Sequence, residues 1–214
     1  MADIAVVDYG MGNLRSVAQA LLHVADGQSV LITSDPVEIA KASRVVFPGQ
    51  GAMPDCVREL DARGLRATVL DAAASKPFLG ICIGLQLLFE HSEEGNVDGL
   101  GVFPGQVKRF ASGMTDAQGY KLKVPHMGWN RVHQTMAHPL WAGIDQDERF
   151  YFVHSYYVEP QDNSLTAGLS DYPASFTCAI ARDNIFAVQF HPEKSQHAGL
   201  HLLRNFVHWD GNPC

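Results

Sequence analysis

Basic charge is scarce in this sequence. The 214 residues contain 16 lysines and arginines against 23 aspartates and glutamates, which gives a formal net charge of -7 at pH 7. The basic residues are scattered and form no run. Because a nucleic-acid-binding protein usually has a basic patch, this charge argues against that class. Charged residues make up 18% and hydrophobic residues 46% of the chain, as is ordinary for a soluble globular protein.

Long apolar runs and closely spaced cysteines are also missing. No apolar stretch reaches the roughly 18 residues of a transmembrane helix, and the start, MADIAVVDYG, lacks the basic segment of a signal peptide. The four cysteines (Cys56, Cys82, Cys178 and Cys214) form no C-x-x-C pair, so a zinc site is not indicated. We therefore predict a cytosolic protein with reduced thiols, no metal and no cofactor.

Strand and helix patterns alternate along the first 92 residues. Strand-like apolar runs cover 4–9, 29–33, 44–49 and 77–82, and helical patterns cover 13–25, a short segment capped by Asp35, segments up to 75, and 85–92. After residue 100 come shorter strands at 107–110, 122–133, 149–158, 175–182 and 185–190, and a last helix at 197–209. We predict one α/β domain over residues 1–214: a three-layer, open, mixed and largely parallel sheet with helices on both faces. Ligands of such folds bind beyond the C-terminal ends of the strands.

Two glycines enclose Cys82 in the segment GICIG at 80–84, where a strand pattern gives way to a helical one. A cysteine that only fills the core needs no glycine on either side. A nucleophile on a sharp strand-to-helix turn does, because the turn leaves no room for neighbouring side chains. The helix start would also favour a thiolate there. From these residues alone, core filler and nucleophile are equally good interpretations of Cys82.

A base and its orienting group follow the last strand pattern. His191 lies just past the strand at 185–190, and Glu193 stands two residues further on, after a stiffening proline. In extended chain, residues i and i+2 point to the same side, so Glu193 can fix the tautomer of His191. A lone histidine at a strand end is usually a surface residue. Together with Cys82 at the same sheet edge, however, the pattern predicts a Cys82–His191–Glu193 triad.

Acyl transfer also needs hydrogen-bond donors for the developing oxyanion. The strand at 44–49 ends in the turn FPGQG, whose glycines allow the backbone N–H groups to approach a substrate closely. We predict that the oxyanion site combines this turn (Gly49, Gln50 and Gly51) with the N–H of Ile83. Taken singly, the turn is typical of an ordinary strand-to-helix connection.

These segments together resemble the class I (triad) glutamine amidotransferases. Within that family the resemblance is to the glutaminase subunits of imidazole glycerol phosphate synthase. It rests on DYGMGNLRSV (8–17), FPGQGAM (47–53), GICIGLQLLFEHSEEG (80–95), VPHMGWN (124–130), YFVHSYYV (151–158) and QFHPEKSQ (189–196). DYGMGN and PHMGWN are the motifs specific to that branch.

The resemblance implies an activity and a set of substrate contacts. Cys82 would attack the side-chain amide of glutamine, releasing glutamate and ammonia through a thioester. By analogy with the family, the substrate would be held by Gln86, by Glu94 and by the main chain around His154, Ser155 and Tyr156. Solvent exposure without a role is the alternative for Glu94.

The resemblance also implies a partner protein. Ammonia would pass to a cyclase subunit, a HisF-type (β/α)8 barrel joined in a heterodimer, which forms imidazole glycerol phosphate and AICAR in histidine biosynthesis. The predicted docking residues come from DYGMGN and PHMGWN, namely Gly10, Met11, Gly12, Asn13, His126, Met127, Trp129 and Asn130. For Trp129, a core position is the alternative to an interface anchor.

Two other patterns carry no prediction of a site. GMGN is not a dinucleotide fingerprint, because Arg15 stands where the third glycine would be. His197 and His201 are four residues apart on the last predicted helix, but no third ligand is evident.

Three rivals from other classes remain at this stage. The chain could be the small subunit of anthranilate or aminodeoxychorismate synthase, against which the two branch motifs argue. It could be a free-standing cysteine hydrolase that turns over glutamine without a partner. It could also be a non-catalytic flavodoxin-like binding module, for which the triad would be a coincidence.

Overall fold

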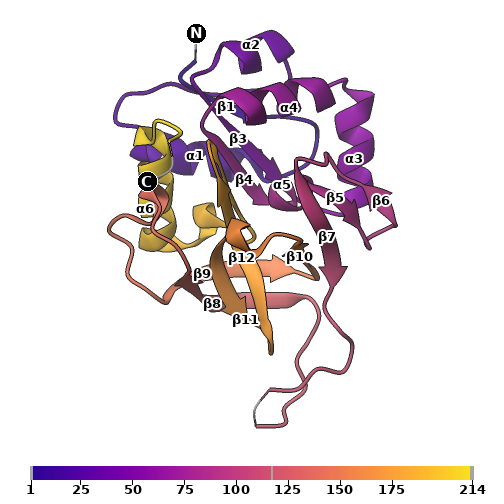
Figure 1. Ribbon diagram of the computed structural model, residues 1–214. Coiled ribbons are helices and arrows are strands. Elements are labelled where there is room, and N and C mark those ends of the chain that lie inside the picture. The colour runs from indigo at the N-terminus through magenta and orange to yellow at the C-terminus, as the bar shows by residue number, and fades with distance from the viewer. Residues whose placement is uncertain (1, 117, 213–214) are drawn as a thin grey trace.

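The computed structural model describes residues 2–116 and 118–212 (Figure 1). The first half contains β1 (Ile4–Val7), α1 (Leu14–Val24), β2 (Val30–Thr33), α2 (Pro36–Lys41), β3 (Arg44–Gly49), α3 (Met53–Ala62), α4 (Arg66–Ser75), β4 (Phe78–Cys82), α5 (Ile83–Gln86), β5 (Phe89–Ser92) and β6 (Val97–Asp98). The second half contains β7 (Phe103–Arg109), β8 (His126–Gln134), η1 (Pro139–Trp141), β9 (Glu148–His154), β10 (Tyr156–Pro160), η2 (Asn163–Leu165), β11 (Thr166–Asp171), β12 (Ser175–Arg182), β13 (Ile185–Val188), η3 (Pro192–Lys194) and α6 (Gln196–His208).

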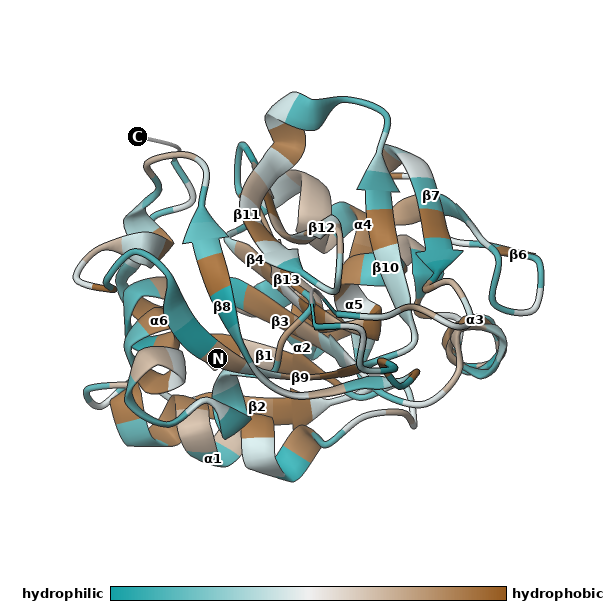
Figure 2. Cartoon of the chain, turned by 90° about the horizontal axis from the view of Figure 1, so that it is seen from below, coloured by the Kyte–Doolittle hydropathy of each residue, from teal (hydrophilic) through white to brown (hydrophobic). Residues whose placement is uncertain are grey.

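Five parallel strands form the centre of the sheet, in the order β2-β1-β3-β4-β13. Every residue of β1, β4 and β13 is buried, as expected of parallel strands covered on both faces. Helices α1 and α6 pack together on one side, and α2, α3 and α4 lie on the other (Figure 1). Figure 2 shows the central strands β1 and β3 coloured largely hydrophobic. The predicted α/β fold is confirmed.

The later strands extend this sheet in a mainly antiparallel way. Strand β12 pairs antiparallel with β13, and the order continues through β10, β7, β5 and β6. Strands β11, β8 and β9 branch from β12. The N–H of His191, just after β13, donates to the carbonyl of Tyr151 in β9, and β10 contacts α5, which follows Cys82. The segments that follow β4 and β13 therefore meet the β9–β10 segment near the C-terminal ends of the parallel strands.

The helix predicted at 85–92 is wrong beyond residue 86. Helix α5 ends at Gln86, and Phe89–Ser92 forms β5, which pairs with β7. All residues from 81 to 89 are buried, so this stretch has no polar face to reveal its periodicity. The strand predicted at 149–158 is also broken, because Ser155 separates β9 from β10.

Three buried histidines make the fold sensitive to acid. Burial lowers the pKa of His126 and His138 to about 4 and that of His154 to about 3. The unfolded chain takes up these protons near pH 6.5 while the folded chain does not. The contribution of these three neutral histidines to stability is therefore full above pH 6.5 and declines as the pH falls towards 4.

We expect His138→Asn to weaken this pH dependence. Between pH 7.5 and 5.5 each of His126, His138 and His154 should contribute a loss of about 1 kcal/mol in unfolding free energy, and the variant should lack the contribution of His138. Asparagine can keep the N-cap contact that His138 makes with the N–H of Leu140. Urea unfolding at the two pH values measures the difference. An equal loss in both proteins would contradict the assignment.

Within the described part of the chain, none of the helices has the length and hydrophobicity needed to span a lipid bilayer.

Candidate active site

Cys82 sits at the sharp turn between β4 and α5. Its φ of 57° and ψ of -110° are unusual for a residue with a side chain, and such strain is characteristic of functional turns. A Cβ on Gly84 would lie 1.8 Å from the carbonyl oxygen of Phe47, and one on Gly80 would lie 2.9 Å from Ala187 Cβ. The two glycines are therefore required by backbone packing around the turn.

His191, the predicted base, and Glu193, its orienting carboxylate, lie together in the buried interior. The imidazole Nδ1 is 2.9 Å from Glu193 Oε1, and both side chains are almost completely buried. The N–H of His191 donates to the carbonyl of Tyr151, and the hydroxyl of Ser195 donates to the carbonyl of His191. Main-chain bonds thus fix the segment that carries the imidazole.

The charge of Cys82 and Glu193 favours a protonated His191. Burial opposes the imidazolium and is the largest single influence on it. The nearby Cys82 and the Glu193 carboxylate together outweigh it and raise the pKa of His191 to about 10. Cys82 and His191 both line the same cavity, in the arrangement that a nucleophile and its base require.

A cavity of about 270 Å³ opens above this pair. Its lining combines polar side chains with main chain from several parts of the fold, namely Gln50, Gly51, Cys82, Ile83, Gln86, Glu94, Pro125, Val153, His154, Ser155, Tyr156 and His191. All five predicted substrate contacts are among them, as are three of the four predicted oxyanion residues. The fourth, Gly49, pairs with Cys82 in the sheet register and lies beneath the surface. The sequence thus predicted most of the residues that line this cavity.

The polar residues Gln86 and Glu94 differ in how they are held. Gln86 is fully buried, and its Nε2 donates to Gln189 Oε1 and to the carbonyl of Tyr156, at 3.0 and 3.3 Å. Glu94 is only partly buried, and its Oε2 accepts the N–H of Met53 at the start of α3, at 2.8 Å. Glu94 is therefore not merely solvent-exposed, since it caps α3 as well as lining the cavity.

The loop at 10–13 lies against the predicted oxyanion turn. A Cβ on Gly51 would lie 2.9 Å from Met11 Cε, and one on Gly12 would lie 3.8 Å from the Cα of Gly49. A change in the conformation of this predicted docking loop would therefore directly change its contacts with the turn.

Strand β8 presents two large apolar side chains to solvent. Met127 is 63% and Trp129 43% exposed, so the alternative of a core position for Trp129 is wrong. His126, predicted on the docking surface, is instead 4% exposed and stacks on Phe152 and Tyr172. Alternate residues of a strand point to opposite faces, which turns His126 inward while Met127 and Trp129 point outward.

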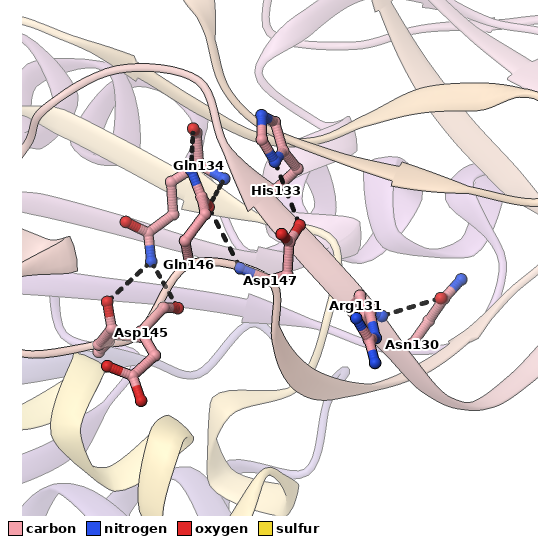
Figure 3. A network of polar contacts seen from close by, with 8 residues as sticks. Asn130, Arg131, His133, Gln134, Asp145, Gln146 and Asp147 are labelled. Carbon is pink, nitrogen blue, oxygen red and sulfur yellow. Dashed lines mark hydrogen bonds and ion pairs between the residues drawn. The ribbon is translucent and has the colours of Figure 1, made fainter.

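Polar contacts brace the far end of β8 (Figure 3). Gln134 and Gln146 exchange hydrogen bonds between side chain and backbone in both directions, at 2.6 and 2.9 Å. His133 Nδ1 lies 3.1 Å from Asp147 Oδ1. The 145–147 loop thus holds this end of the strand in place.

Four residues near the site were missed by sequence reasoning. Pro125 and Val153 line the cavity, Ser195 bonds to the His191 carbonyl, and Gln189 Nε2 donates to Cys82 Sγ at 3.6 Å. Gln189 comes directly before the segment FHPE, which carries His191 and Glu193, and it follows a run of apolar strand residues. A lone amide in an otherwise apolar strand was the available signal.

Metal ligands do not gather in residues 2–116 and 118–212, where no group of three or more histidine, cysteine or acidic side chains could hold an ion. His197 and His201 lie on the exposed side of α6. Cys56 and Cys178 are buried and unpaired, and burial raises the pKa of both thiols, that of Cys56 to about 11. Cys214 lies outside the described residues.

The fold and site define a class of protein. The family model for class-I glutamine amidotransferases matches residues 5–209, so the chain belongs to that family. A solved structure titled as a glutamine amidotransferase superposes with a TM-score of 0.71 at 16% identity, covering 96% of this chain and 99% of the other. A putative GMP synthase component from Thermoplasma acidophilum gives a TM-score of 0.69 at 20% identity, covering 97% and 92%. These two show the shared fold.

The curated relatives narrow the membership to one branch. The chain is 70% identical to imidazole glycerol phosphate synthase subunit HisH of Nitrosospira multiformis, over 98% of this chain and 99% of that protein. It is 67% identical to the same subunit of Aromatoleum aromaticum, with the same coverage. Within the family it thus belongs to the HisH branch. The predicted preference for this branch over the anthranilate and aminodeoxychorismate synthase subunits is confirmed.

Proposed function

We propose that this chain is the glutaminase subunit of an imidazole glycerol phosphate synthase, with a role in histidine biosynthesis in the cytoplasm. The observation that carries the proposal is the strained Cys82 turn within reach of a buried His191–Glu193 pair, at the floor of a cavity that can admit a small amide. Nucleophile, base and orienting carboxylate are three of the parts that thiol acyl transfer needs.

The reaction proceeds in two stages. The Cys82 thiolate attacks the side-chain amide carbon of glutamine, and the proton on His191 Nε2 passes to the departing ammonia. A γ-glutamyl thioester remains on Cys82. His191 then takes a proton from water, which attacks the thioester, and glutamate leaves as the thiolate re-forms. Glu193 holds the Nδ1–H of His191 throughout, so that Nε2 faces the reacting atoms.

The oxyanion of each tetrahedral intermediate needs N–H donors on the side of the cavity where Cys82 lies. The N–H of Ile83 opens α5, and the first N–H groups of a helix have no partner within it. The turn at Gly49–Gly51 lies alongside Cys82 in the sheet. We assign the donors to Ile83 and to this turn. Gln86, Glu94 and the main chain at 154–156 hold the rest of the glutamine.

The partner is a cyclase subunit of the HisF type, a (β/α)8 barrel that receives the ammonia. The loop at 10–13 supports this docking face because Met11 lies against Gly51, which lines the cavity. Strand β8 supports it because its exposed Met127 pairs with Val153 of the cavity lining, and the exposed Trp129 follows on the same face of the strand. Exposed aromatic and methionine side chains on a braced strand are typical interface anchors. The barrel would thereby contact residues that also touch the oxyanion turn.

We expect Trp129→Ala to weaken the heterodimer by about 30-fold in Kd, which corresponds to about 2 kcal/mol for a central aromatic anchor. Titration calorimetry with the cyclase subunit measures the change. Leu22→Ala is the matched control, since Leu22 is 47% exposed on α1 and lies outside the proposed face. An unchanged Kd for Trp129→Ala, or an equal loss for Leu22→Ala, would contradict the docking assignment.

The test of the proposed function is ammonia release from glutamine by the purified chain, measured without a partner and then in the presence of the cyclase subunit with its nucleotide substrate. A slow rate that rises on the order of 10²-fold or more with partner and nucleotide supports a gated subunit, because roughly 3 kcal/mol of oxyanion stabilisation is enough for that gap. A full rate without the partner would indicate the free-standing hydrolase instead. If no ammonia were released under any condition, a non-catalytic binding module would be the remaining alternative.

A further inference from the structure

A buried pair of amides connects the proposed nucleophile to the substrate cavity. Gln189 and Gln86 are 0% and 1% exposed. Gln86 Nε2 donates to Gln189 Oε1 at 3.0 Å, and Gln189 Nε2 donates to Cys82 Sγ at 3.6 Å, within reach for a sulfur acceptor. The side chains of Cys82, Gln189 and Gln86 therefore form one continuous hydrogen-bonded row beneath the cavity.

One backbone carbonyl fixes the direction of every bond in this row. The carbonyl oxygen of Tyr156 can only accept, so the group of Gln86 that contacts it must be the NH2 group. The second hydrogen of that NH2 group then goes to Gln189, which must present its oxygen to Gln86. Gln189 is thereby left with its NH2 group towards Cys82, so an N–H donor faces the sulfur and not a carbonyl oxygen.

The histidines on the other side of Tyr156 support the same assignment. His154 Nδ1 donates to that carbonyl at 2.7 Å, and its Nε2 accepts from His126 Nδ1 at 2.9 Å. His126 Nε2 in turn accepts from Asn130 Nδ2 at 3.3 Å. Asn130 presents its oxygen to the N–H of Arg131, which fixes the amide (Figure 3). The Tyr156 carbonyl is thus the acceptor at the end of a chain of hydrogen bonds in which every donor and acceptor role is consistent.

We propose that Gln189 is a positioning residue that holds the Cys82 sulfur through an N–H donor and sets which atom of Gln86 faces the substrate. With both hydrogens of Gln86 occupied, its Oε1 is a buried acceptor without a partner in the described structure. Such an atom can accept an N–H group of a bound amide substrate. Loss of Gln189 would free the Gln86 amide to rotate and would remove a donor from the thiolate. This inference rests on the proposed role of Cys82 as nucleophile.

The test compares Gln189→Met, which has a similar shape and no donor or acceptor of this kind, with the parent chain. Two readouts are needed: the kcat and KM of ammonia release in the complex with the cyclase subunit, and the rate of alkylation of Cys82 by iodoacetamide against pH. Alkylation is followed by mass spectrometry of the Cys82 peptide and does not require turnover. We expect alkylation at neutral pH to slow roughly tenfold, its profile to move to higher pH, and KM to rise, as for loss of one hydrogen bond to a charged group.

Two further variants make the result decisive. Cys178→Ala changes a fully buried thiol on the neighbouring strand and leaves the amide row intact, so it measures general destabilisation. Gln189→Glu keeps the shape and the acceptor for Gln86 but removes the N–H donor at the sulfur. It serves as the test variant if Gln189→Met does not fold. A Gln189 variant with the parental kcat, KM and alkylation profile would overturn the inference, as would one with losses matching those of Cys178→Ala. A parent chain that releases no ammonia would instead overturn the proposed function.

Discussion

Replacing Cys82 by alanine should lower ammonia release from glutamine by roughly 10⁴-fold or more, because removal of a nucleophile leaves only binding and oxyanion contacts to act. The change keeps a Cβ at the strained turn, so the backbone and the unfolding free energy should change little. A coupled assay for glutamate and ammonia, run with the cyclase subunit present together with its nucleotide substrate, measures the loss. Thermal unfolding of the same samples checks that the fold is intact.

Cys178→Ala supplies the matched control for this loss. Its thiol is as well buried as that of Cys82, but it is not part of the cavity lining, and burial raises its pKa. It should keep the parental rate. If Cys82→Ala kept a rate within tenfold of the parent, Cys82 would not be the nucleophile. If Cys178→Ala lost as much activity as Cys82→Ala, the loss would be due to core packing.

Replacing Gly84 by alanine should have the largest effect on stability. The added Cβ would lie 1.8 Å from the carbonyl oxygen of Phe47, in the middle of β3. Neither backbone can move aside, because β3 is paired on both sides and α5 begins one residue earlier. We expect a loss of about 3 kcal/mol or more in unfolding free energy, measured by urea unfolding. Activity should fall with it, since the turn carries Cys82.

Gly27→Ala separates steric conflict from backbone strain. Gly27 has a φ of 91°, but a Cβ there would meet nothing within 4 Å. Its substitution should cost only about 1 kcal/mol. If Gly84→Ala cost no more than Gly27→Ala, the close packing of β4, α5 and β3 around the nucleophile would not be as described.

The parallel half of the fold was predictable from the sequence because its elements carry clear local patterns. The buried runs in β1, β3 and β4 and the capping Asp35, which accepts the N–H of Val37, each signal their own structure. The stretch after Cys82 gave no such signal. From Leu85 to Phe89 every side chain is buried, so helix and strand look alike, and the pairing of β5 with β7 depends on residues about 15 positions away.

The site was predictable where chemistry and spacing coincide and not where contacts are long-range. Cys82, His191 and Glu193 follow from short motifs with a mechanistic reason. Gln189 could not be assigned, because its partners Cys82 and Gln86 lie more than 100 residues away and meet it only in the folded sheet. His126 was misplaced for a related reason: one motif alternates between the two faces of β8, and sequence adjacency to Trp129 does not reveal which face is buried.

The central claim is that glutamine is cleaved through a covalent intermediate on Cys82, and mass spectrometry after a rapid acid quench tests it most directly. The chain, mixed with the cyclase subunit, its nucleotide substrate and isotope-labelled glutamine, should carry a labelled γ-glutamyl group on the peptide that contains Cys82. The label should be absent from Cys82→Ala. Ammonia release with no label on that peptide, or with label on another residue, would contradict the account.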